Sequence, residues 1–244
     1  MTLNIQPVEK RRYSEDGYLE VHSVFYTIQG EGPFTGVPAV FIRLAGCNLQ
    51  CPGCDTDYTT SRTSMDSEDL LRLVLAAHGV DLIGGLVVIT GGEPFRQNIH
   101  PIILELLEAG FTVQIETNGT LPPPNIAFYE MCSLDTNEPN KCFVVCSPKT
   151  GAVNKELRPI ICAYKYVLSC DAVGGDGLPL RALDHTAQPF VARPHVGFTG
   201  NIYLQPCDTK RESLNAQNLQ ACVASVLKHG YTLQVQLHKI IDVA

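Results

Sequence analysis

Gly46-Cys47-Asn48-Leu49-Gln50-Cys51-Pro52-Gly53-Cys54-Asp55-Thr56 carries three cysteines at C-x3-C-x2-C spacing. Pro52 and Gly53 bend this stretch, so its thiolates can converge on one metal centre, and soft sulfur ligands select zinc, copper(I) or iron–sulfur clusters. The number of ligands is informative, because a closed structural zinc site needs four. A four-iron, four-sulfur cluster held by three thiolates keeps one iron open for a substrate or cofactor.

A structural zinc site is the alternative for these cysteines. Its fourth ligand would come from elsewhere in the chain, and His22 or Asp55 could supply it. The stretch would then be a zinc knuckle without an open metal position. The spacing of the cysteines leaves both interpretations open.

Composition limits the class of protein. The chain has 244 residues, 45% of them hydrophobic and 18% charged, which predicts one α/β domain over residues 1–244. A net charge of −7 argues against nucleic acid or an anionic membrane as a partner. No apolar run approaches the roughly 18 residues of a membrane span. Ten cysteines without a secretory segment before them predict a protein of the reducing cytoplasm.

Apolar patterns along the chain alternate between strands and helices. Residues 1–17 have little apolar pattern and predict a poorly ordered arm, and residues 171–199 predict an irregular insertion. Apolar runs and alternating patterns predict strands over 18–25, 39–44, 86–89, 111–115, 142–146, 164–168, 201–204 and 231–237. Helical spacing predicts long helices over 67–78, 99–109 and 214–229, with at best a short one over 127–131.

Seven strands from Ala39 onward and only three long helices predict a mostly parallel sheet, curled into an incomplete, TIM-like barrel. Polar motifs follow the carboxyl ends of these strands, where the active sites of βα folds lie. The residues expected to converge there are Cys47, Glu93, Glu116, Ser147 and Gln205.

Two motifs resemble those of one enzyme superfamily. The cysteine stretch resembles the cluster loop of radical S-adenosylmethionine (radical SAM) enzymes, and Thr90-Gly91-Gly92-Glu93-Pro94 resembles their GGEP motif. The resemblance implies a partial barrel of the radical SAM type, a 4Fe-4S cluster, and cleavage of S-adenosylmethionine to a 5′-deoxyadenosyl radical. Glu93 would then contact the methionine ammonium, and its alternative role is to cap a helix N-terminus.

Within this superfamily the chain resembles the 7-carboxy-7-deazaguanine synthase family of queuosine and deazapurine biosynthesis. The matching segments are 25–32, 36–44, 54–56, 116–119, 147–149 and 236–239. The resemblance implies a carbon–nitrogen lyase that contracts the ring of 6-carboxy-5,6,7,8-tetrahydropterin to 7-carboxy-7-deazaguanine with loss of ammonia. It also implies magnesium, a homodimer, and an electron donor such as flavodoxin or ferredoxin.

The resemblance also implies a role for individual residues. Cys47, Cys51 and Cys54 would hold the cluster, and the Thr56 hydroxyl would bind magnesium. The residues expected at the cofactor are Gly92, Glu93, Glu116, Ser147, Pro148, Lys149, Gln205, Pro206, Cys207 and Asp208. Those expected at the pterin are Ile28, Gln29, Gly30, Glu31, Arg43, Thr90, His238 and the terminal carboxylate of Ala244.

Several alternatives remain at this point. Arg43 lies in an apolar strand, where it could form a structural ion pair or bind a substrate carboxylate. A glycyl-radical activase is the alternative radical SAM function, although it gives no reason for the segment Gln29–Gly32 or for Thr56. A zinc- or cluster-binding module without catalysis is the alternative from another class.

Overall fold

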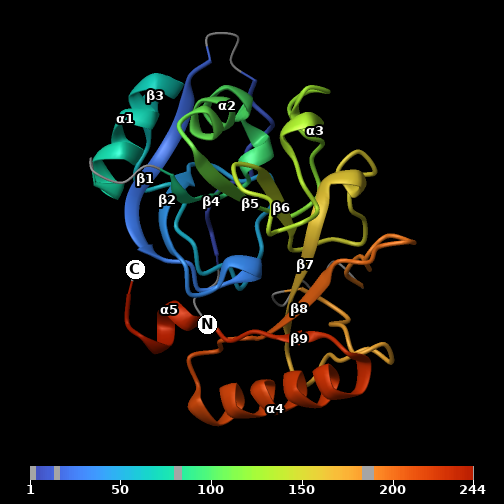
Figure 1. The fold of residues 1–244 in the computed structure, drawn as a ribbon. Coiled ribbons are helices and arrows are strands. Elements are labelled where there is room, and N and C mark those ends of the chain that lie inside the picture. Colours follow the sequence, from blue (N-terminus) through green and yellow to red (C-terminus); the bar gives the residue numbers. More distant parts are fainter. Residues whose placement is uncertain (1–3, 14–16, 80–83, 183–189, 244) are drawn as a thin grey trace.

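The computed structural model describes residues 4–13, 17–79, 84–182 and 190–243 (Figure 1). These residues form a nine-stranded sheet in the order β3-β1-β2-β4-β5-β6-β7-β8-β9, with β2 and β4 to β9 parallel and β1 antiparallel to β2 and β3. The strands are β1 (Leu19–Ile28), β2 (Pro38–Leu44), β3 (Thr63–Met65), β4 (Gly85–Gly91), β5 (Phe111–Thr117), β6 (Cys142–Cys146), β7 (Ile161–Leu168), β8 (Asn201–Pro206) and β9 (Thr232–Leu233). Because β3 and β9 end the order, the described sheet is open.

Few helices accompany this sheet. Helix α1 packs against α2 and against β1 and β2, α2 packs on β5, and α4 packs beside β8 and β9, as Figure 1 shows. The helices are α1 (Ser67–His78), α2 (His100–Glu108), α3 (Phe128–Met131), α4 (Glu212–His229) and α5 (Leu237–Ile240), with 3-10 turns η1 (Gly32–Phe34), η2 (Pro94–Arg96) and η3 (Arg158–Ile160). The fold class predicted from the sequence, a partial TIM-like barrel with mostly parallel strands, is confirmed.

The helix-covered face of the sheet holds the main core. Alternate residues of each strand point to this face, for example Val40, Ile42 and Leu44 of β2, all fully buried. Val87 and Ile89 of β4 continue the same cluster. Burial of these apolar side chains is the main stabilising term of the fold, at about 1.5–3 kcal/mol for each large side chain.

The opposite face of the sheet changes character along the strands. Near the amino ends it is apolar, because Ala39, Leu86 and Val88 form a small buried cluster against the ring of Phe34. Toward the carboxyl ends the same face carries polar side chains such as Glu116 of β5. The inside of the partial barrel is therefore filled by apolar side chains at the amino ends of the strands and lined by polar side chains at their carboxyl ends.

Residues 4–13 differ from the poorly ordered arm that the sequence predicts. The Asn4 amide donates to Pro52 O at 3.2 Å and the Glu9 amide to Cys47 O at 2.7 Å. Val8 forms a β-bridge with Cys47. Backbone hydrogen bonds to the cysteine stretch order this segment, and such pairing leaves no signal in apolar periodicity.

The end of the chain also differs from prediction. Only Thr232 and Leu233 of the expected strand 231–237 pair with β8, and α5 begins at Leu237. The buried side chain of Gln234 accepts from the Gly32 amide at 2.8 Å and donates to Thr35 Oγ1 at 2.8 Å. These bonds hold the chain against the η1 turn, so the strand stops.

Two further segments complete the comparison with the sequence. The short strand β3 was missed, because three mostly exposed residues give no apolar pattern. In the predicted insertion, the described residues 171–182 and 190–199 contain one isolated bridge, between Val173 and Pro179, and no helix or longer strand. Across the described residues, no helix has both the length and the apolar character needed to cross a membrane.

Candidate active site

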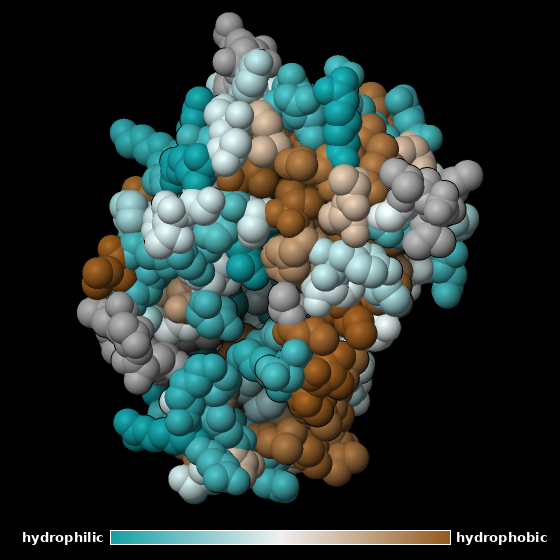
Figure 2. Space-filling view, turned by 90° about the vertical axis from the view of Figure 1, so that its left-hand side faces the viewer, coloured by the Kyte–Doolittle hydropathy of each residue, from teal (hydrophilic) through white to brown (hydrophobic). Residues whose placement is uncertain are grey.

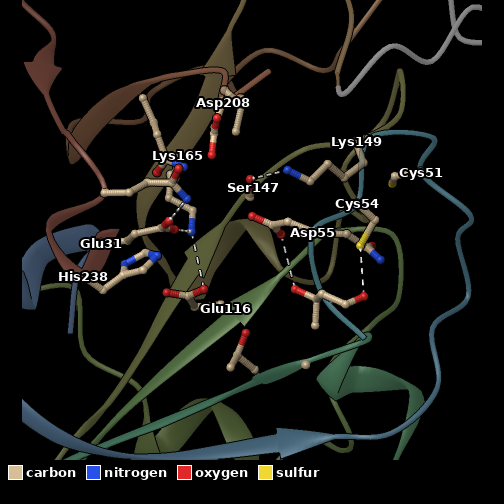
Figure 3. Close-up of a pocket in the computed structure, with 18 of the residues that line it drawn as sticks. Glu31, Cys51, Cys54, Asp55, Glu116, Ser147, Lys149, Lys165, Asp208 and His238 are labelled. Carbon is tan, nitrogen blue, oxygen red and sulfur yellow. Dashed lines mark hydrogen bonds and ion pairs between the residues drawn. The ribbon is translucent and has the colours of Figure 1, made fainter. Parts of the chain in front are cut away.

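A cavity of about 470 Å³ opens at the carboxyl ends of the parallel strands. Figure 2 shows hydrophilic residues around a hollow on one face of the molecule, and Figure 3 shows side chains that line the cavity. The described residues from the predicted site line this cavity with three exceptions, which are Gly30, Glu93 and Pro148. Ala244 lies outside the described residues.

The cysteine stretch follows directly on β2 and is held by the glycine-rich turn that follows β4. The Gly92 amide donates to Leu44 O, and the Glu93 amide donates to Gly46 O, both at 3.1 Å. A Cβ atom at position 92 would lie 1.9 Å from Gly46 O, so only glycine fits there. The GGEP motif therefore supports the cysteine stretch through its backbone.

All three thiols of the cysteine stretch line the same cavity. Burial raises the pKa of Cys47 to about 12 and that of Cys51 to about 11, although the Lys149 charge opposes the shift at Cys51. Burial also raises the pKa of Cys54. The protein itself thus keeps these groups as neutral thiols, and a bound metal would supply the positive charge that thiolates need. Three soft donors facing one space fit a cluster that leaves one iron open.

The two residues considered as a fourth zinc ligand have other neighbours. His22 Nε2 lies 4.0 Å from Asp57 Oδ1, and Asp55 Oδ2 lies 3.7 Å from Lys239 Nζ. Within the described ranges, no three His, Cys, Asp or Glu side chains are grouped closely enough to hold a single metal ion.

Glu93 caps the N-terminus of the 3-10 turn η2, which is the alternative role that the sequence offered for it. Its carboxylate is fully buried and accepts from the amides of Asn118 and Phe95 and from Thr117 Oγ1, at 2.7 to 3.0 Å. Burial raises the pKa of Glu93 to about 7, against these hydrogen bonds. The sequence placed Glu93 at the cofactor, but the structure places its carboxylate outside the cavity, where it caps η2 and joins the ends of β4 and β5.

Arg43 lies at the carboxyl end of β2 and lines the cavity. Its guanidinium lies 5.2 Å from the ring centroid of Phe25, and Nε is buried without a hydrogen-bond partner. Among the residues that the structure describes, Arg43 forms no ion pair. Of the two alternatives for this residue, the geometry favours a binding role over a structural pair within the described chain.

Glu31 and Glu116 share one lysine in the cavity wall. Lys165 of β7 forms an ion pair with Glu31 and lies 3.4 Å from Glu116 Oε2 (Figure 3). Gln29 Nε2 donates to Glu116 Oε1 at 3.2 Å. Glu116, predicted at the cofactor, therefore lies beside residues predicted at the pterin.

A second set of polar side chains lies at the carboxyl ends of β6 and β8. Lys149 Nζ donates to Ser147 Oγ at 2.9 Å, and burial lowers the pKa of Lys149. Asp208 accepts from Lys210 at 2.8 Å and from Lys239 of α5 at 3.1 Å. The hydrogen bond from Lys210 holds the pKa of Asp208 below its ordinary value. This wall therefore presents charged groups next to the thiols.

The C-terminal segment completes the wall beside Glu31. A Cβ atom at Gly30 would lie 2.1 Å from His238 Nδ1, so the glycine lets the imidazole approach the backbone. The Leu237 amide donates to Gly30 O at 3.3 Å. Gly30 thus positions His238, which lines the cavity itself.

The sequence reasoning missed several lining residues. Lys165, Gln236 and Lys239 line the cavity, yet none was selected as a site residue. A signal existed for Lys165, because a lysine within the apolar run Tyr164–Leu168 is unusual in a buried strand. Gln236 and Lys239 lay within the matching segment 236–239, but no physical pattern singled them out.

Comparison with known proteins agrees with this geometry. Residues 41–135 match the model of the radical SAM superfamily. The 7-carboxy-7-deazaguanine synthase of Rhodospirillum rubrum is 39% identical over 93% of both chains, and that of Rickettsia prowazekii is 36% identical over 92% of this chain and 88% of its own. The crystal structure of QueE from Escherichia coli superposes with a TM-score of 0.64 at 26% identity, covering 90% of this chain and 94% of that one. Nothing in these comparisons favours a glycyl-radical activase. On this evidence the chain belongs to the 7-carboxy-7-deazaguanine synthase family of radical SAM enzymes.

Proposed function

We propose that this protein converts 6-carboxy-5,6,7,8-tetrahydropterin to 7-carboxy-7-deazaguanine and ammonia. The observation that carries the proposal is that three thiols suited to a cluster and a set of polar side chains suited to a small acid line the same cavity. Product and ammonia together contain every atom of the substrate, so the reaction needs no net oxidant. When bound, the reduced cluster and S-adenosylmethionine supply the one-electron cleavage that starts the reaction.

We propose that the chain binds the substrate through two kinds of group. Arg43 has no ion-pair partner among the described residues and can hold the substrate carboxylate through two parallel hydrogen bonds. Gln29, Glu31 and His238 provide donors and acceptors for the edge of a flat heterocycle. The low dielectric of the cavity strengthens each of these contacts.

The remaining wall suits the cofactor. Ser147 and Lys149 at the end of β6, and the segment Gln205–Asp208 at the end of β8, lie beside the thiols. A sulfonium cofactor carries both an ammonium and a carboxylate, which Asp208 and Lys149 can complement. Gly92 adds backbone groups that a ligand can approach closely.

The Thr56 hydroxyl is the proposed magnesium ligand. It lines the cavity, and its Oγ1 lies 3.4 Å from Asp55 Oδ1, so two hard oxygen donors stand beside the Cys54 thiol. Magnesium prefers such donors and commonly keeps several waters and substrate oxygens in its coordination shell. A homodimer, a cytoplasmic location and an electron donor such as flavodoxin or ferredoxin complete the proposal.

The test is product identification under anaerobic conditions. Reconstituted protein is incubated with dithionite, S-adenosylmethionine and 6-carboxy-5,6,7,8-tetrahydropterin, and the mixture is analysed by mass spectrometry. We expect 7-carboxy-7-deazaguanine and ammonia in equal amounts. Cofactor cleavage without consumption of the pterin would contradict the substrate, and a colourless protein with stoichiometric zinc would contradict the chemistry.

A further inference from the structure

Lys165 occupies an unusual place in the sheet. Its neighbours Tyr164 and Tyr166 point into the main core, so strand alternation points Lys165 toward the cavity. The residue is only 6% exposed. Burying an ammonium group is costly unless it is paired, so its partners must compensate for lost water.

Two acidic side chains provide that compensation, and both belong to the cavity wall. Lys165 Nζ contacts Glu31 Oε2 and Glu116 Oε2, which approach from a loop and from β5 (Figure 3). The second oxygen of Glu31 accepts from Gln236 at 2.8 Å, and that of Glu116 accepts from Gln114 at 3.0 Å and from Gln29 at 3.2 Å. The lysine is therefore the central contact of a network that three other segments share: the loop with Gln29 and Glu31, strand β5, and the C-terminal segment with Gln236.

The charges of this network support one another. Burial by itself raises the pKa of Glu31, but the Lys165 charge and the hydrogen bonds from Lys165 and Gln236 hold it well below its ordinary value. Burial lowers the pKa of Lys165, but the charges of Glu116 and Glu31 outweigh it, and its pKa lies above the ordinary value. Two negative charges against one positive charge leave the network acidic.

Hydrogen-bonding capacity remains after these contacts are formed. A carboxylate offers about four acceptor sites, and an ammonium group offers three donors. Glu31 uses two of its sites, for Lys165 and Gln236, and Lys165 uses two donors. Glu116 uses three of its sites, for Lys165, Gln29 and Gln114. The unused sites belong to side chains that line the cavity, where only a ligand or water can reach them. The unused acceptors outnumber the unused donor, so this wall suits a ligand rich in N–H groups.

We propose that Lys165 is a positioning residue of the substrate site, which holds Glu31 and Glu116 side by side as paired acceptors for N–H groups of the substrate ring. The inference rests on the proposed function, because a reduced pterin carries N–H groups on its ring and on its amino substituent. It adds to that function a residue that acts through two others. Lys149 and Asp208 of the cofactor wall form no hydrogen bond with Lys165, Glu31 or Glu116 among the described contacts.

The test compares three variants with the wild type by equilibrium binding of the tetrahydropterin and, separately, of S-adenosylmethionine. Lys165→Met removes the shared donor, and Lys165→Arg restores a cation that can reach both acids. Lys141→Met is the matched control, because Lys141 forms an ion pair with Glu138 outside the cavity. We expect Lys165→Met to weaken pterin binding by about 10- to 100-fold, Lys165→Arg to recover most of that loss, and Lys141→Met to change nothing.

A double variant keeps the test decisive where Lys165→Met is unstable. Glu31→Gln combined with Lys165→Met removes one charge of each sign, so the network keeps its net charge but loses the shared donor and one of the two carboxylate acceptors. We expect this variant to bind the pterin as weakly as Lys165→Met while S-adenosylmethionine binding stays within about twofold of wild type. Recovery of pterin binding in the double variant would show that net charge matters and would overturn the positioning role.

The pH dependence of binding separates positioning from a general structural effect. In Lys165→Met the Glu31 carboxyl loses its cation, so its pKa rises, and its protonated form has fewer free acceptor sites for N–H groups. Other charges acting on Glu31 and Lys165 come from Glu116, His238 and Lys149. We expect pterin binding by this variant to weaken by about fivefold or more between pH 8 and pH 6, and the wild type to change by less than about twofold. Parallel profiles would overturn the inference.

The outcomes also distinguish this inference from the proposed function. Wild-type protein that forms 7-carboxy-7-deazaguanine while Lys165→Met has an unchanged KM refutes the role of Lys165 alone. Wild-type protein that cleaves S-adenosylmethionine but does not bind the tetrahydropterin refutes the proposed substrate, and the inference with it. A raised KM with a nearly unchanged rate of cofactor cleavage supports both.

Discussion

Gly92 faces the carbonyl of Gly46 so closely that a Cβ atom on Gly92 would lie 1.9 Å from Gly46 O and 2.9 Å from the Cys47 nitrogen. The glycine-rich turn and the cysteine stretch are therefore in backbone contact. Because the neighbouring amide of Glu93 donates to the same carbonyl, the turn sets the path along which Cys47 leaves β2.

The first prediction concerns this contact. Gly92→Ala must move the cysteine stretch, so we expect a loss of about 1–3 kcal/mol in the free energy of unfolding and a markedly lower iron content after reconstitution. Gly175→Ala is the control, because no atom lies within 4 Å of its added Cβ. Iron analysis and urea denaturation measure both effects. Full iron loading of Gly92→Ala would contradict the supporting role of the turn.

The second prediction concerns the cluster thiols. Cys51→Ala removes one of three ligands, so we expect loss of cofactor cleavage by more than about 100-fold with a soluble, folded protein. Cys170→Ala, at a cysteine outside the cavity lining, should keep wild-type activity. Formation of 5′-deoxyadenosine and circular dichroism are the measurements. Full turnover by Cys51→Ala would refute the assignment of the cluster.

The third prediction concerns magnesium. Thr56→Ala removes a hydroxyl oxygen beside Cys54, so activity should respond less to added magnesium. The control is Thr63→Ala, because Thr63 is exposed in β3. Rates are measured over a magnesium titration in chelator-treated buffer. An unchanged titration curve for Thr56→Ala would remove this residue from the metal site.

The fourth prediction concerns the C-terminal tail. The Val243 amide donates to His238 O at 3.1 Å, so the tail runs beside a residue of the cavity wall. Deleting residues 242–244 should weaken tetrahydropterin binding by about 10-fold or more and S-adenosylmethionine binding by less than about twofold. Calorimetric titrations of the two ligands provide the comparison. Equal losses for both ligands would contradict a specific role of the tail at the pterin.

The fifth prediction concerns the attachment of the N-terminal segment. Arg96 is 2% exposed, and its guanidinium donates to Glu20 Oε2 at 2.6 Å and lies 3.2 Å from Glu9 Oε2. We expect Arg96→Met to lower the free energy of unfolding by about 3 kcal/mol, because it leaves the buried Glu20 carboxylate without its fully buried partner.

The control for this prediction is an exposed pair. Arg72 contacts Glu68 on the surface of α1, so Arg72→Met should cost less than about 1 kcal/mol. Burial raises the pKa of Glu20, but the hydrogen bond from Arg96 and nearby arginine charges outweigh this and lower it. Because the pKa of Glu20 is lower in the folded state than in the unfolded state, its ion pair stabilises the fold above the unfolded pKa. This stabilisation is lost as the pH falls, so the free energies of unfolding of Arg96→Met and Arg72→Met should converge in acid. A constant difference down to about pH 3 would contradict this ion pair.

Much of the fold and of the cluster site was predictable from local patterns. The cysteine stretch, the turn around Gly92 and the segment Ser147–Lys149 each follow an apolar run, and parallel strands bring their carboxyl ends to one edge. That rule requires no knowledge of which strands are neighbours. It brought Cys47, Glu116, Ser147 and Gln205 to one cavity before any contact was known, and the other predicted site residues came from the resemblance to the family.

Contacts between distant segments were not predictable in the same way. Lys165 and Glu31 are 134 residues apart, and the sequence cannot reveal that they form an ion pair. Glu93 lies within a recognised motif, yet its carboxylate is used by Asn118 and Thr117 rather than facing the cavity. Residues 4–13 lack apolar periodicity, but backbone hydrogen bonds hold them to the cysteine stretch.

By itself the sequence determined the chemistry available to this protein, because ligand type, ligand spacing and the alternation of strands and helices are properties of short stretches. Only the tertiary structure decided which side chains line the cavity and which lie outside it and hold its walls in place. The physical reason is that a buried charge is stable only beside its partner, and the partner of Lys165 is chosen by how the strands pack rather than by its neighbours in the chain.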